Sequence, residues 1–135
     1  MKVRLSLIAR EVIIAADSGV PSAINIVEGI QVEAFPLFLA NLSYLSIWAK
    51  DNNDQNEQVG TLRVLIDETE IISNSVNFVF ASNKNVLRHV AQIQGLIIEK
   101  PSRLTFKIEV GDQVSQYTID VVGRPQISAP QEKTV

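Results

Sequence analysis

The chain has 135 residues, 46% of them hydrophobic and 20% charged, which matches one ordinary globular domain and excludes a chain that is disordered throughout. Its formal net charge of −3 gives no extended cationic field. Its lysines and arginines are scattered along the sequence, so nucleic-acid binding is disfavoured unless folding gathers them on one surface. The sequence contains no cysteine, which excludes disulfides and thiolate sites.

The first strand is predicted from residue 2 toward residue 14, where Val3, Leu5 and Leu7 alternate with polar positions. Charged residues such as Arg4 interrupt the apolar character, which is unlike a secretory signal. No apolar run in the chain is long enough for a membrane span. We therefore expect a soluble, cytoplasmic protein without a membrane partner.

Two extended segments follow the first turn. Residues 23–35 are extended in character and contain Gly29, which predicts a bulge or a close backbone approach because glycine otherwise weakens a strand interior. The Phe35-Pro36 dipeptide ends this segment. Residues 38–48 are apolar on both pleat faces, which predicts a central strand that is covered on both sides.

The middle of the chain alternates again after a polar loop at residues 51–58, and we predict strands at residues 62–66 and 71–80. Residues 85–98 fit two patterns. A helix is indicated by apolar residues at helical spacing behind a possible N-cap at Asn85, whereas other apolar positions suit a strand. We favour the strand for this segment.

The clearest local signal lies at residues 103–121. Leu104, Phe106 and the following apolar residues alternate strictly with polar ones, and Gly111-Asp112 then supplies the backbone angles of a tight turn. This pattern predicts a β-hairpin. Beyond residue 122 the periodicity is lost, so residues 123–135 are predicted to be a flexible C-terminal tail.

The number and spacing of these segments predict the fold class. Seven or eight short strands occur without any convincing alternation of strands and helices. This arrangement indicates an all-β protein in which antiparallel strands form a sandwich of two sheets. We expect a single domain over residues 1–122.

Several segments also occur together in a familiar combination: the amino-terminal strand, Ile24-Asn25-Ile26 reaching Gly29-Ile30, the Phe35-Pro36 pair, the amphipathic residues 60–64 and the closing hairpin. The chain in this respect resembles a family of small uncharacterised bacterial proteins, classed only as a domain of unknown function, over about residues 2–122. The resemblance implies an immunoglobulin-like β-sandwich and supplies no catalytic residues. Pro101-Ser102 stands where many related domains place glycine before the last hairpin.

The sequence offers little catalytic chemistry. His89 is the only histidine, and a general base or a zinc site would need partners that are not evident around it. No nucleophile-elbow or phosphate-binding glycine motif is present. Tyr44 and Trp48 share a face with Leu42, which predicts core residues and not a stacking platform. We therefore expect no enzymatic activity and no cofactor.

The densest cluster of oxygen ligands comprises Asp51, Asp54 and Glu57, with asparagines between them. Hard cations such as calcium prefer such ligands. The segment lacks the glycine of an EF-hand at its sixth position, where Asn56 stands, and Leu62 stands where that motif needs glutamate. We favour a solvated loop, and the three acids stay candidates for a metal site.

Our first functional hypothesis is a non-catalytic interaction domain. An open sandwich presents strand edges and loops that can bind a partner protein or a second copy of the chain. One alternative is a small-ligand or calcium-binding module that uses the apical loops. Another is a bacterial or phage structural subunit.

Overall fold

The computed structural model of the chain describes residues 1–81 and 83–125. Within these ranges the chain forms nine strands and no helix. The strands are β1 (Lys2–Ile14), β2 (Pro21–Ile26), β3 (Gly29–Val32), β4 (Leu37–Ala49), β5 (Glu57–Ile66), β6 (Thr69–Val79), β7 (Val86–Ile98), β8 (Ser102–Val110) and β9 (Gln113–Gly123). The all-β prediction is confirmed, and the expected number of seven or eight strands is corrected to nine.

The additional strand comes from residues 23–35, which we expected to be one strand. Asn25 has a left-handed φ of 56°, and the backbone N–H of Val27 donates to the carbonyl oxygen of Ile8 at 2.7 Å. The chain thereby leaves β2 and starts again as β3 at Gly29. Gly29 is no bulge within a continuous strand, because it is the residue at which β3 begins.

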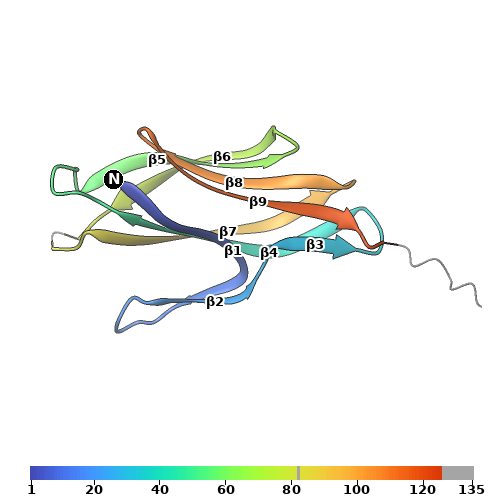
Figure 1. Cartoon of the computed structure of the whole chain (residues 1–135), viewed down its shortest axis with the longest axis horizontal. Coiled ribbons are helices and arrows are strands. Elements are labelled where there is room, and N and C mark those ends of the chain that lie inside the picture. The colour runs from blue at the N-terminus through green and yellow to red at the C-terminus, as the bar shows by residue number, and fades with distance from the viewer. Residues whose placement is uncertain (82, 126–135) are drawn as a thin grey trace, which may run out of the picture.

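The nine strands form two sheets that lie one above the other in Figure 1, so the structure is sandwich-like. One sheet has four strands in the order β2-β1-β4-β7, and the other has five in the order β3-β9-β8-β5-β6. The pairs are antiparallel except β3 with β9, which is parallel. The expectation of a wholly antiparallel sandwich is therefore wrong at this pair, because the chain crosses from β2 in one sheet to β3 in the other and enters beside β9 in the same direction.

Two pairs of aromatic side chains lie in the core between the sheets. Tyr44 and Trp48 from β4 are fully buried, which confirms their prediction as core residues. The Trp48 ring lies edge-on to Phe78 at a centroid distance of 5.0 Å, and the Tyr44 ring lies 5.6 Å from Phe106. Because β4 pairs with β1 on one side and β7 on the other, its prediction as a central strand is also confirmed.

The closing hairpin is formed as the alternation predicts. β8 and β9 pair antiparallel, with Arg103 opposite Asp120 and Val110 opposite Gln113. Gly111 has a φ of +59°, which the turn requires and which glycine adopts without strain. β9 ends at Gly123; Arg124 and Pro125 follow it, and the rest of the predicted tail, residues 126–135, lies outside the described residues.

Residues 86–98 form strand β7, so our preference for a strand is confirmed, and the structure explains the mixed pattern. Ala91 and Ile93 are buried, and the next buried residues are Leu96 and Ile98. Side chains on one face of a strand are two residues apart. Because Ile93 and Leu96 are three residues apart and both buried, the side of the strand that faces the core changes from odd-numbered to even-numbered residues between them. Gly95, with a φ of +75°, lies between these two residues.

The end of β1 leaves the sandwich. β1 pairs with β4 only as far as Ala9, which lies opposite Ser43, and from there to Ile14 it pairs with β2. Figure 1 shows this hairpin extending on the outer side of the four-stranded sheet, away from the five-stranded sheet. We call residues 10–26 the arm.

Candidate functional site

The predicted metal-binding acids lie at the end of the sandwich that holds the amino terminus. The amino group of Met1 lies 2.7 Å from Asp54 Oδ2 and 3.9 Å from Asp51 Oδ2. The hydrogen bond from this amino group, followed by the one from the backbone N–H of Asp51, holds the pKa of the Asp54 carboxyl below its ordinary value. Glu57 begins β5 and its side chain is exposed. Among residues 1–81 and 83–125, no group of three or more His, Cys, Asp or Glu side chains is placed to hold a metal ion.

His89 lies on the inner face of β7, opposite Ser46 of β4, and is partly buried. Its ring packs against Phe78 at a centroid distance of 5.2 Å. The Nδ1 atom is buried without a hydrogen-bond partner, and burial lowers the pKa of the imidazole. His89 is therefore neutral at neutral pH. Among residues 1–81 and 83–125, no carboxylate bonds to its Nδ1 to orient the ring, as a catalytic base would require.

A small polar network connects the two sheets, and no local pattern in the sequence indicates it. The hydroxyls of Ser6 in β1 and Ser115 in β9 are hydrogen-bonded at 2.6 Å, and the Tyr44 hydroxyl also contacts Ser115. Burial raises the pKa of Tyr44, and the hydrogen bonds to Ser115 and Ser6 act in the opposite direction. The phenol stays protonated and its polar group is satisfied, so the network is a structural tie between the sheets.

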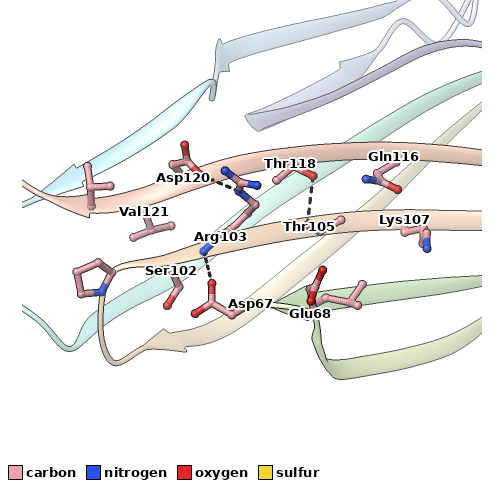
Figure 2. Close-up of a pocket in the computed structure, with 13 residues that line it drawn as sticks. Asp67, Glu68, Ser102, Arg103, Thr105, Lys107, Gln116, Thr118, Asp120 and Val121 are labelled. Carbon is pink, nitrogen blue, oxygen red and sulfur yellow. Dashed lines mark hydrogen bonds and ion pairs between the residues drawn. The ribbon is translucent and has the colours of Figure 1, made fainter.

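A hollow of about 1050 Å³ lies on the outer face of the five-stranded sheet. Figure 2 shows that Arg103 and Thr105 of β8 meet Asp120 and Thr118 of β9 across its floor. Arg103 Nε donates to Asp120 Oδ1 at 3.1 Å, and the backbone N–H of Arg103 donates to Asp67 Oδ1 at 2.9 Å. Because the guanidinium of Arg103 is already paired with Asp120, this surface has the character of a solvated sheet face.

The arm carries several exposed aliphatic side chains. Five of its aliphatic side chains are 39–53% exposed; they are Ile13, Ile14, Val20, Ile24 and Ile26. Single exposed aliphatic residues are common on proteins, whereas these five are gathered on one short hairpin. The sequence showed an alternating strand here, but it could not show that the rest of the protein leaves both faces of this hairpin uncovered.

Comparison of the sequence with protein-family models finds no match, and no curated protein matches it either. The part of the chain that the structure describes contains no helix long and apolar enough to cross a membrane. The class of protein is therefore defined by the fold alone: an all-β protein with two stacked, mostly antiparallel sheets and a projecting hairpin.

Proposed function

We propose that the protein is a non-catalytic interaction domain with an immunoglobulin-like sandwich, and that it docks through the arm. The observation that carries this proposal is the exposure of five aliphatic side chains on a single hairpin. Burying them against a partner would remove apolar surface from water, which is the main favourable contribution to most protein association.

The structure of the arm supports a docking role in a second way. A two-stranded hairpin is at best marginally stable in water without a surface to pack against. Beyond Ala9 the arm pairs only with itself, since β4 no longer accompanies β1 there. A partner that covers the arm would therefore supply packing that the chain itself does not provide.

The partner that we propose is a second copy of the chain. Ile13 and Ile24 lie on the same face of the arm, because the register pairs Glu11 with Ile24 and Ile13 with Ser22. Glu11 and Ser22 lie on this same face beside the two isoleucines. Two such faces related by a two-fold axis match each other when the isoleucines pack together and the polar side chains remain at the rim of the contact. The strand edge of β2 also lies on the arm and is unpaired on its outer side in the single chain.

The oligomeric state tests the proposal. We expect light scattering after size-exclusion chromatography to show a dimer. The double variant Ile13→Ser, Ile24→Ser should raise the dissociation constant of the dimer at least about tenfold, because each substitution removes roughly 1 kcal/mol or more of the free energy gained by burying apolar surface. Val59→Ser with Val79→Ser is the matched control, because these valines are 67% and 59% exposed on the five-stranded sheet. A strict monomer at high concentration, or equal weakening by both double variants, would overturn the proposal.

A further inference from the structure

The two sheets differ in charge, and the difference is not visible in the sequence order. The strands of the four-stranded sheet carry Lys2, Arg4, Arg10 and Arg88 against Glu11 as their only acid. The strands of the five-stranded sheet carry three cationic and four acidic residues. The molecule as a whole is acidic, so the four-stranded sheet is a basic element in an acidic protein.

The cations of the two sheets also differ in how they are paired. On the five-stranded sheet Arg63 bonds to Glu70 at 2.6 Å and to Glu109 at 2.7 Å. Within the described part of the chain, by contrast, Lys2, Arg4 and Lys50 have no carboxylate within 4.0 Å. Lys2 and Arg4 therefore keep their positive charge available to a ligand. Lys50 also has no direct ion pair, although its charge helps to lower the pKa of the nearby Asp54 carboxyl.

The register gathers the three cations at one end of the four-stranded sheet. Val3 lies opposite Trp48 and packs against the core, so its neighbours Lys2 and Arg4 face outward, with an irregularity in the pairing at Arg4. Lys50 follows β4 directly, and its backbone N–H donates to the carbonyl oxygen of Asn85 at 2.8 Å. Three segments that are far apart in the sequence thus meet at this place.

A hollow of about 550 Å³ lies between them. It is lined by Lys2, Arg4, Lys50, Asn85 and Asp51 together with the small apolar residues Val3, Ala49 and Val86. Its volume falls within the range of small-ligand sites. Asp51 is the one acid in the lining, and its Oδ2 lies 3.9 Å from the amino group of Met1. This amino group partly balances the charge of Asp51, so Asp51 does not neutralise one of the three cations.

We propose that this hollow binds a small ligand that carries two or more phosphate groups. Ammonium and guanidinium groups form charge-assisted hydrogen bonds with phosphate oxygens, and arginine can do so with two parallel bonds. Three cations against one carboxylate favour a multiply charged anion over a single one. The site is separate from the arm, so the inference does not depend on the proposed dimer.

Isothermal titration of the full chain with tripolyphosphate at low ionic strength tests the proposal. We expect one saturable site and weaker binding of inorganic phosphate. The double variant Lys2→Gln, Arg4→Gln is expected to lose at least about tenfold in affinity, because charge-assisted hydrogen bonds to phosphate are lost. Thermal unfolding of each variant checks that the fold is retained.

The matched control is Lys100→Gln with Lys107→Gln, which removes the same charge from the loop before β8 and from β8 itself. Equal loss of affinity in both double variants would show a general charge effect and overturn the site, as would a wild-type protein that does not bind tripolyphosphate. Co-sedimentation with phosphatidylcholine vesicles that contain a phosphorylated inositol lipid, in addition to tripolyphosphate binding, identifies a lipid headgroup as the source of the phosphates. Tripolyphosphate binding without co-sedimentation identifies a soluble ligand.

Discussion

Of the six glycines, Gly60 has the least room for a side chain. It lies in β5, one residue before Thr61, which pairs with Glu109 of β8. A Cβ atom at Gly60 would lie 2.6 Å from the carbonyl oxygen of Glu109 and 2.6 Å from Cγ2 of Val110. Both distances are about 0.8 Å shorter than the 3.4 Å at which ordinary contact begins.

The substitution Gly60→Ala should therefore destabilise the protein. The Glu109 carbonyl belongs to the backbone of a paired strand and cannot rotate away, and Val110 is buried in the core. Overpacking of this kind costs about 1–3 kcal/mol, and the lower entropy of alanine in the unfolded chain offsets about 0.4–1 kcal/mol of it. We expect a net decrease of about 1 kcal/mol in the free energy of unfolding.

Urea unfolding followed by the fluorescence of Trp48, the only tryptophan and fully buried, measures this decrease. Gly29→Ala is the matched control, because a Cβ there would lie 3.6 Å from the Asp120 carbonyl oxygen, an ordinary contact. We expect Gly29→Ala to be equal to the wild type or up to about 1 kcal/mol more stable. If both variants unfold at the same urea concentration, the close approach of β5 and β8 at Gly60 is wrong.

Three further predictions concern the interior. Burial lowers the pKa of His89, so as the pH falls through about 6.5 the unfolded chain takes up a proton that the folded chain does not yet bind. The free energy of unfolding should therefore fall by up to about 1.4 kcal/mol per pH unit below that pH. Urea titrations at several pH values should show a smaller fall for His89→Gln than for the wild type. Ser115→Ala leaves the buried Tyr44 hydroxyl without this partner and should cost about 1–3 kcal/mol, whereas Tyr44→Phe should cost only about 1 kcal/mol, and equal costs in thermal unfolding would contradict the network. Phe106→Ala should lower the free energy of unfolding by about 3–5 kcal/mol because the ring is fully buried. Phe38→Ala should lower it by less than about 0.5 kcal/mol because that side chain is 64% exposed. Comparable urea midpoints for the two variants would refute the assignment of the core.

The sequence predicts best where one short segment contains the whole signal. The closing hairpin is such a case, because the alternation around Phe106 and the turn at Gly111 are both local properties of residues 103–121. β4 is another, since apolar residues on both pleat faces are sufficient to place a strand inside a sheet. These elements were predicted correctly without any knowledge of their partners in the fold.

The sequence predicts poorly where the answer depends on a distant segment. Nothing near Gly29 shows that β3 pairs with β9, so the parallel pair could not be expected from it. The close approach that we expected at Gly29 occurs at Gly60, because β8 supplies the crowding atoms there. Residues 85–98 resembled a helix because apolar side chains occur on both faces of β7, with Ile93 buried and Ile97 58% exposed, and their combined spacing imitates a helical period.

The candidate sites follow the same rule. Lys2, Arg4 and Lys50 are ordinary scattered cations in the sequence, and only the pairing of β1 with β4 brings them to one hollow. Asp51 and Asp54 stand close together in the sequence, and the structure directs both toward the Met1 amino group. Cation binding by the 51–57 loop and a structural role in a bacterium or phage stay predictions from the sequence.

The arm and the hollow lined by Lys2, Arg4 and Lys50 use different parts of β1, so the dimer and the phosphate site can be tested independently. Residues of β1 up to Ala9 are held by β4, while those beyond it are held by β2. Ile13→Ser therefore changes a segment that shares no strand partner with Lys2, and substitutions without shared partners act additively. Arm variants that abolish dimerisation should bind tripolyphosphate with wild-type affinity. Loss of both properties in one arm variant would mean that the dimer itself completes the hollow.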